Sequence, residues 1–474
     1  MQNVSKWIQE EVVKPLKGFV PAIKEAVDEF LALPNIYKWV TVLVIIYMAV
    51  PPLLFAQDPV QFHLIKLNTM YITVLLLVLS VLFGYQHFPY LSKSWKIFKW
   101  ERYVIFIALF FMLFSLAINF PMMNRFVRAD IISTPVFYGA GPNFTSIFYY
   151  WLAFLVFFVG PVVYPHLPKK LVTYVVYLGL FVTGALITYQ VLIDDFIGVS
   201  RTYLFGFGNT NYTPDPFAIL GLYVLIPLLY NKKIKVYPTL LGIFFFVVVL
   251  LSISRASWVG LAIAIAGAMG YLLYRKELEL KRFLILSGMG VGALGVLVLV
   301  LLALGQTIIL DNFVSLLGAF SADGDLAAVS SLRTPLWASA IQMWLYGVAD
   351  GTEVFRLNFA TIFFGNGQSV YLWLDGSTQY LVTNVHQMFL DILMSGGIFV
   401  FAIFIFLLVQ QFRYVFSLMK HDVRYVSLFA GLLFIMGKWL FNSLNGLHAP
   451  FVYTVFILIT YHYMMSVDKP VKHR

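Results

Sequence analysis

The chain has 474 residues, of which 61% are hydrophobic and 11% charged, and its formal net charge at pH 7 is +10. Because soluble domains carry roughly 25% charged residues, this composition excludes an ordinary soluble fold. Cysteine is absent, which excludes disulfides, thiolate metal ligands and cysteine nucleophiles. The eight histidines show none of the spacings typical of metal sites. We therefore expect no metal, no other cofactor and no nucleic-acid partner.

Residues 1–36 form a segment of their own, in which charged and apolar residues alternate at helical spacing. The segment lacks the uninterrupted apolar stretch and the small-residue cleavage site of a signal peptide. It predicts an amphipathic cytoplasmic helix, for which two placements fit about equally well. The helix lies on the membrane surface, or it is a solvated leader packed on the protein.

The rest of the chain consists mainly of long apolar stretches separated by short polar ones. A helix needs roughly 20 mostly apolar residues to cross a membrane, and about 12 stretches qualify. The predicted fold is an all-α, polytopic transmembrane bundle, in which residues 37–305 supply the first nine spans, 306–385 form an outer cap loop, and 386–474 supply three more spans and a cytoplasmic tail. The expected spans are 37–56, 68–85, 103–122, 146–165, 170–192, 214–230, 236–253, 256–274, 283–305, 386–410, 425–443 and 450–467.

The basic residues in the short loops predict an orientation. Loops that face the cytoplasm are enriched in lysine and arginine, and one orientation satisfies this rule at every loop, with both termini in the cytoplasm. In this orientation the inner basic residues are mostly lysines, whereas the outer ones are mostly arginines. The outer arginines are Arg125, Arg128, Arg201, Arg255, Arg333 and Arg356.

This excess of outer arginines requires a reason other than topology. The guanidinium is a planar fork of donors that binds phosphate or carboxylate through two hydrogen bonds, so the arginines together predict a site for an anion. The alternative is that each arginine merely pairs with a nearby outer acid. The candidate acids are Asp130, Asp194, Asp195 and Asp215.

Two outer segments are longer than simple connections. Residues 193–216 are rich in Gly, Asn, Thr and Pro, which favour irregular backbone, and Arg201 lies in their middle. Residues 306–385 are too many for a plain loop and contain two apolar stretches of helical character, 307–320 and 331–346. We expect the second segment to form a small helical cap over an outer cavity.

His386 ends this cap and immediately precedes an apolar helix that continues through Gly396 and Gly397. Because histidine exchanges a proton near physiological pH, His386 is a candidate proton acceptor; the alternative is a simple interfacial histidine. Two charged residues, Asp391 and Lys438, fall within expected spans, where charge is costly. We predict that these two pair with each other, and the alternative is that Asp391 holds the His386 imidazole.

From about Arg201 to its C-terminus, the chain resembles the O-antigen ligase and O-antigen polymerase superfamily of bacterial membrane glycosyltransferases. The resemblance lies in Arg201 within a Gly/Asn-rich outer loop and in the turn Ser254–Ser257, which opens a long apolar helix. It continues with Arg333 before an aromatic-rich helix, and with His386 followed by Gly397 after ten intervening residues. It implies a GT-C-like helical fold.

The resemblance also implies the substrates and the site. The donor would be a glycan carried by undecaprenyl diphosphate on the outer leaflet of the bacterial cytoplasmic membrane, and the acceptor another glycan or a lipid. Arg201 and Arg255 would stabilise the diphosphate as it leaves, and His386 would take the proton of the acceptor hydroxyl as a general base, without a metal. Arg333, from the resemblance, and Arg125 and Arg128, from the excess of outer arginines, are expected to bind substrate.

Several functions stay open from the sequence. Trp337 stands where ligases carry leucine, which favours a polymerase over a ligase, and Arg356 is the alternative to Arg333 as the cap-loop arginine. A transporter or flippase of an anionic lipid or solute is the alternative from another class, and it would place charged residues near the membrane midplane. A purely structural scaffold would leave the outer arginines unexplained.

Overall fold

The structure is a computed structural model, and it describes residues 14–54, 68–128, 153, 155–193, 213–231, 236–252, 254–278, 280–303, 311, 314, 333–346, 357–365, 371–375, 378–382, 387–441 and 450–467. Nearly all of this part of the chain is helical, as the composition predicts. The helices are α2 (Lys14–Ala32), α3 (Asn35–Ala49), α5 (Asn68–Phe83), α6 (Tyr90–Ile97), α7 (Lys99–Arg128), α9 (Gly160–Val163), α10 (Lys169–Ile193), α12 (Pro214–Tyr230), α13 (Val236–Leu251), α14 (Arg255–Tyr274), α15 (Leu280–Ala303), α18 (Arg333–Tyr346), α19 (Phe359–Phe364), α20 (Met388–His421), α21 (Val426–Trp439) and α22 (Pro450–Ser466).

The apolar helices give the chain the character of a membrane protein. Three described helices are long and apolar enough to cross a membrane by length and composition, at Lys169–Val191, Arg255–Tyr274 and Met388–His421. Further apolar helices of 10–17 residues occur in the described part of the chain, among them α12 and α13. Each stretch that the sequence predicts as a span contains a helix.

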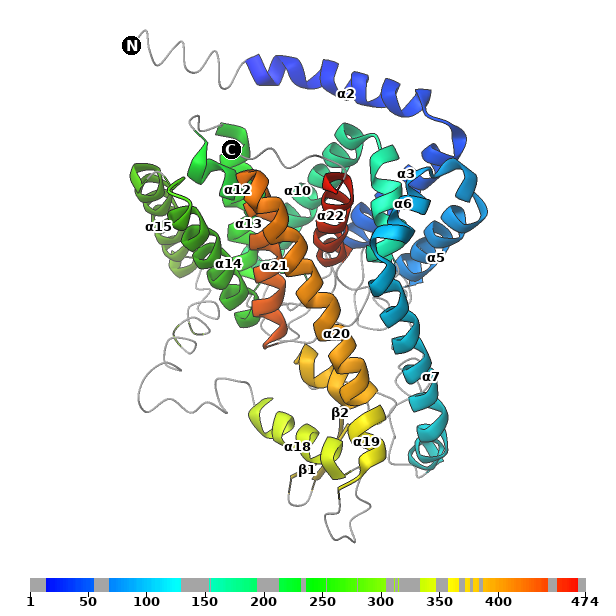
Figure 1. Cartoon of the computed structure of the whole chain (residues 1–474). Helices are drawn as coiled ribbons and strands as arrows, with labels where there is room; N and C mark the ends of the chain where they lie inside the picture. The colour runs from blue at the N-terminus through cyan, green and yellow to red at the C-terminus, as the bar shows by residue number, and fades with distance from the viewer. Residues whose placement is uncertain are drawn as a thin grey trace.

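Most helices form a bundle, and α2 lies across one end of it (Figure 1). We call this the α2 end. There Lys169 lies over the rings of Tyr164 and Tyr461, and the ring of Tyr425 lies edge-on against His462. The start of α10, the start of α21 and the end of α22 therefore meet at the α2 end.

We call the opposite end of the bundle the far end; it is formed by the starts of α12 and α14 and the end of α21. Helices α14 and α21 pack closely there because each presents a glycine to the other. A Cβ added at Gly260 would lie 2.8 Å from the carbonyl oxygen of Phe434, and one added at Gly437 would lie 3.0 Å from the Cα of Gly260. Small residues let membrane helices approach backbone to backbone, and this contact sets the position of the last turn of α21.

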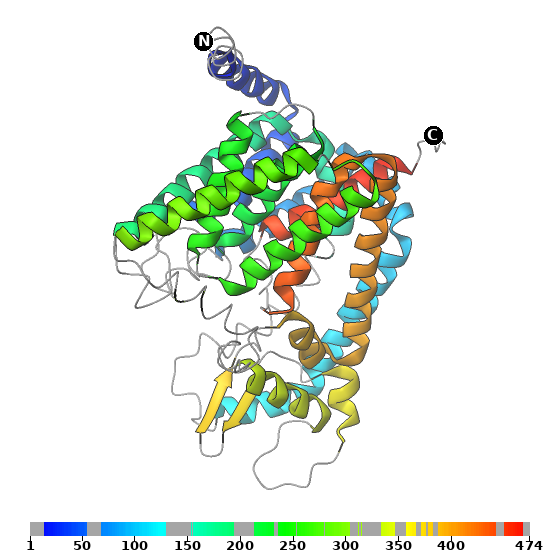
Figure 2. The ribbon, with the colours of Figure 1, turned by 90° about the vertical axis from the view of Figure 1, so that its left-hand side faces the viewer.

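Beyond the far end, α7 and α20 continue into a smaller layer with α18, α19 and two strands (Figure 2). The strands β1 (Tyr371–Asp375) and β2 (Thr378–Val382) form an antiparallel hairpin, in which Tyr371 pairs with Val382 and Asp375 with Thr378. α18 occupies the second helical stretch expected in the cap, whereas the first, 307–320, lies largely outside the described residues. The hairpin is a feature that the sequence analysis did not predict.

Helix α20 is bent rather than continuous. Gly397 interrupts it with φ +67° and ψ −171°, so the expected uninterrupted helix through Gly396 and Gly397 is instead a short segment, residues 388–396, followed by a long one. A positive φ is readily adopted only by glycine. The bend aims the first segment of α20 away from the axis of the second.

Candidate functional site

The sequence-predicted site residues differ in how much the structure says of them. Arg201 and His386 lie outside the described residues, as does Arg356. Arg333 is the first residue of α18, and the last turn of α7 carries the two remaining arginines. Those two arginines are Arg125 and Arg128. The side chain of Arg255 is described, and the candidate site is built from it outward.

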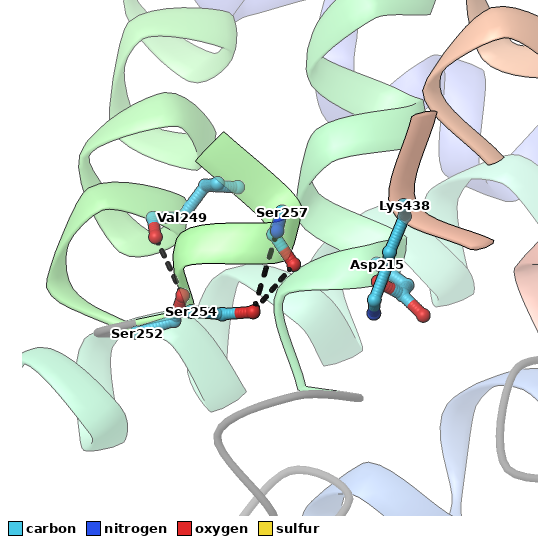
Figure 3. Close-up of polar contacts among 6 residues, drawn as sticks. All are labelled: Asp215, Val249, Ser252, Ser254, Ser257 and Lys438. Atoms are coloured by element: carbon cyan, nitrogen blue, oxygen red, sulfur yellow. Dashed lines mark hydrogen bonds and ion pairs between the residues drawn. The ribbon is translucent and has the colours of Figure 1, made fainter. Parts of the chain in front are cut away.

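Arg255 is the first residue of α14. The serines around it, Ser252, Ser254 and Ser257, hold this turn in place (Figure 3). The hydroxyl of Ser254 accepts a hydrogen bond from the backbone N–H of Ser257 at 3.4 Å and lies 2.9 Å from the Ser257 hydroxyl. This is an N-terminal helix cap. Ser252 donates to the carbonyl oxygen of Val249 at 2.6 Å, so the turn before the cap is also tied down.

The position of Arg255 has an electrostatic consequence. The N-terminus of a helix carries a partial positive charge, which disfavours a cation and favours an anion. Arg255 adds a full positive charge at this same point of a 20-residue helix. The side chain is partly buried and makes further contacts. The cap of α14 is therefore a place where an anion would be stabilised twice, by the helix and by the guanidinium.

The same end of the bundle contains a buried ion pair that corrects the sequence analysis. Lys438, in the last turn of α21, donates to Asp215, in the first turn of α12 (Figure 3). Both side chains have a relative exposure of 0%. The predicted partner of Lys438 was Asp391, which lies in the first turn of α20, so that pairing was wrong. Asp215, a candidate partner for the outer arginines, is paired with a lysine instead.

The helix ends favour the two charges of this pair. A carboxylate is stabilised at a helix N-terminus and an ammonium at a helix C-terminus, and Asp215 and Lys438 occupy those two positions. Even so, removing one partner of a buried pair leaves an uncompensated charge and costs about 3–5 kcal/mol. The second oxygen of Asp215, Oδ2, is buried and has no hydrogen-bond partner among the described residues.

The start of α20 reaches the same region through aromatic rings. Gln387 caps α20, since its side-chain oxygen accepts a hydrogen bond from the N–H of Leu390 at 2.6 Å. In the first turn of α20, the ring of Phe389 lies 6.0 Å from that of Phe404, which lies beyond the bend and 5.6 Å from the ring of Trp439. Trp439 directly follows Lys438 in the sequence. The helix that begins just after His386 is thus packed against the end of α21.

These contacts bring together the beginnings of three helices. α12 follows the segment that contains Arg201, α14 begins at Arg255, and α20 begins two residues after His386. The ion pair joins α12 to α21, the glycine contact joins α14 to α21, and the rings join α20 to α21. The end of α7, with its two arginines, lies instead beside α19 in the smaller layer (Figure 1).

Sequence reasoning missed Asp215 as a buried residue. One signal was present: Asp215 lies between Pro214 and Pro216, directly before an uninterrupted apolar stretch. Proline at the first position of a helix is common, so the three residues mark a helix start with an acid in the first turn. The identity of its partner was not readable, since Lys438 is 223 positions away.

The arrangement suits binding of an anion at the cap of α14, beside a buried and internally neutral pair. Among the described residues no group of three His, Asp or Glu side chains lies close enough to hold a metal ion. A scan against models of known protein families finds none that matches the chain. A search of curated proteins likewise finds no match.

Proposed function

We propose that this chain is a multi-pass membrane glycosyltransferase of the O-antigen polymerase and ligase type. It transfers a glycan from undecaprenyl diphosphate at the outer face of the bacterial cytoplasmic membrane, and so polymerises or ligates a surface polysaccharide. In this proposal the GT-C-like bundle has about 12 spans of roughly 20 residues each. Both termini are cytoplasmic, the far end is the outer end, and residues 306–385 cap it.

The observation that carries the proposal is the position of Arg255, at the cap of α14 and at the end where α12 and α20 also begin. A lipid diphosphate lies at the membrane surface and is doubly anionic, so it matches an arginine at a helix N-terminus. In the sequence, α12 begins 13 residues after Arg201 and α20 begins two residues after His386. The proposal therefore places Arg201 and His386 beside Arg255, at the end of the bundle where α12, α14 and α20 begin.

The proposed reaction is a displacement at the anomeric carbon of the donor sugar. The acceptor hydroxyl forms the new glycosidic bond as His386 removes its proton. The bond between the anomeric carbon and the diphosphate oxygen breaks, and undecaprenyl diphosphate leaves with the electron pair. Arg201 and Arg255 stabilise the negative charge on the leaving diphosphate, so no metal ion is required for the step.

Glycan transfer by the purified protein in lipid nanodiscs tests the proposal. A lipid-linked donor is added, and product formation and donor binding are measured separately. Arg201→Lys and Arg255→Lys keep the charge but lose the bidentate hydrogen bonding of the guanidinium, so both should weaken donor binding and turnover. Arg275→Lys is the matched control, because Arg275 lies at the end of α14 nearer α2. Equal activity in all three variants would contradict the proposal.

His386→Ala separates chemistry from binding. A general base contributes roughly 100- to 10,000-fold to the rate but does not hold the diphosphate. The variant should therefore bind the donor normally and fail to transfer it, and wild-type turnover should fall at pH values where the imidazole is protonated. If donor binding falls in proportion to turnover, His386 is a positioning residue and the base is a different group.

The buried pair favours one alternative function, a transporter or flippase of an anionic lipid. Transporters place paired charges inside the bundle, and Asp215 and Lys438 are such a pair. A vesicle assay distinguishes the two functions. A transporter would move a fluorescent undecaprenyl phosphate across the bilayer without any glycan acceptor, whereas a glycosyltransferase would change the product only when donor and acceptor are both present.

A further inference from the structure

The Asp215–Lys438 pair lies where the elements of the proposed site are joined. Asp215 is in the first turn of α12, the helix that follows the Arg201 segment. The backbone nitrogen of Lys438 would lie 3.2 Å from a Cβ added at Gly260, and Gly260 is five residues beyond Arg255 in α14. A single lysine is therefore in contact with the helix of Arg255 through its backbone and with the helix after Arg201 through its side chain.

A buried ion pair is a poor means of stabilising a fold. Replacing such a pair by apolar residues of similar size is often neutral or stabilising, because the desolvation of both charges is avoided. Buried polar pairs are retained where they fix the register of one helix against another. Here a shift of α12 along α21 would separate the two charges and leave both buried and unpaired. The pair therefore permits one register of α12 against α21 and disfavours registers shifted by a residue or more.

We propose that Asp215 and Lys438 are positioning residues for the anion site at Arg255, at the cap of α14. By fixing the register of α12 against α21, and thus against α14, the pair sets where α12 begins relative to Arg255, the first residue of α14. This inference rests on the proposed function for the identity of the anion, a lipid diphosphate. The register itself is a property of the fold and is measured separately below.

The test compares the charged pair with an apolar one. Asp215→Asn and Lys438→Met each break the pair, and the double variant Asp215→Leu with Lys438→Met replaces it by two apolar side chains. The double variant should recover the melting temperature that the single variants lose, so it remains testable even if the single variants do not fold. The double variant should not recover the wild-type register of α12 against α14, nor the wild-type affinity for undecaprenyl diphosphate.

Two readouts report on the variants. Because the chain has no native cysteine, spin labels at Tyr223→Cys in α12 and Ala266→Cys in α14, both exposed positions, give the distance between those helices. Binding of undecaprenyl diphosphate reports on the arginines. The wild type should show one narrow distance distribution. The apolar double variant should show a broad or shifted one, and should bind undecaprenyl diphosphate about tenfold or more weakly, since small misplacements of binding groups are costly.

A second buried polar contact is the matched control. Tyr414 of α20 donates to Glu101 of α7 at the α2 end of the bundle, and Glu101 is 3% exposed. Glu101→Gln with Tyr414→Phe also removes a buried contact between two helices, but at the opposite end of the bundle from Arg255. Both double variants are measured at the same number of degrees below their own melting temperatures. Under this condition the control variant should keep the narrow distance distribution and the binding of undecaprenyl diphosphate.

The outcomes separate the inference from the function it rests on. A double variant at 215 and 438 with the wild-type distance distribution overturns the positioning role. So does loss of binding to the same extent in the control at 101 and 414. If the wild type itself does not bind undecaprenyl diphosphate, the proposed function fails, while the distance measurement still decides whether the pair sets the register.

Discussion

Gly365 and Gly397 lock α19 onto the bend of α20. Gly365, at the end of α19, lies against the backbone just before Gly397, and Gly397 lies against the backbone just before Gly365. A Cβ added at Gly365 would lie 2.5 Å from the carbonyl carbon of Ser395, and one added at Gly397 would collide with the backbone of Phe363 and Phe364. Both glycines also have positive φ, +74° and +67°. The smaller layer is thus attached to α20 at the bend that follows His386 in sequence.

Gly397→Ala and Gly365→Ala should each loosen this attachment. The strained backbone alone costs about 1–3 kcal/mol for a residue other than glycine, and the collision adds to it. We expect a lower melting temperature and faster proteolysis between residues 304 and 386. Gly288→Ala is the control, because a Cβ there would meet nothing within 4 Å. Unchanged proteolysis in both variants would show that the contact does not hold the cap.

The contact between α14 and α21 predicts a contrast between two glycines of one helix. Gly260→Val places atoms where Phe434 and Lys438 already lie, whereas Gly270 has open space around it. Overpacking of this kind costs about 1–3 kcal/mol, and it should also separate Lys438 from Asp215. The melting temperature should therefore fall for Gly260→Val and stay near the wild-type value for Gly270→Val. Equal melting temperatures would mean that α21 can move away freely.

The proposed orientation predicts which ends of the bundle react from outside the cell. Cysteines placed at Asp325 and Asp375 should react with a membrane-impermeant thiol reagent added to intact cells, and cysteines at Lys170 and Lys233 should not. The absence of native cysteine removes background labelling. The reverse pattern would place the arginines on the cytoplasmic side and remove the basis for an outer glycosyltransferase.

Helix α2 allows the two placements of the N-terminal segment to be distinguished. It is docked on α10, since Glu25 pairs with Lys170 at 2.6 Å and the ring of Phe19 lies 5.9 Å from that of Tyr174. Its apolar surface is only partly used in this contact, because Val20 is 72% exposed. An exposed apolar strip beside lysines is typical of a helix at a membrane surface.

An environment-sensitive fluorophore at Val20→Cys should therefore be quenched by lipids that carry a quencher in their acyl chains. The same fluorophore at Glu29→Cys, which a helix of about 3.6 residues per turn places opposite Val20, should not be quenched. The measurement is made on protein reconstituted in vesicles with phosphatidylglycerol. If neither position is quenched, α2 is a solvated leader packed on the protein, the second of the two placements.

Much of the architecture could be predicted without coordinates. The length of each apolar stretch determines whether a helix can form a span, and this property is local, so the helices α12, α14 and α22 begin within a residue or two of their expected starts. The start of α20 directly after His386 was readable for the same reason. Of the candidate site, the position of Arg255 in a turn between two helices is confirmed by the structure.

The sequence by itself determined the helical membrane class and the approximate ends of its helices, because composition and periodicity act over a few turns of chain. Only the tertiary structure decided which buried charges meet. Lys438 pairs with Asp215 at a separation of 223 positions, and that choice depends on two glycines that let α21 approach α14. The bend at Gly397 was likewise decided by packing, because Gly397 lies against the backbone of Phe363 and Phe364, more than 30 positions earlier in the sequence.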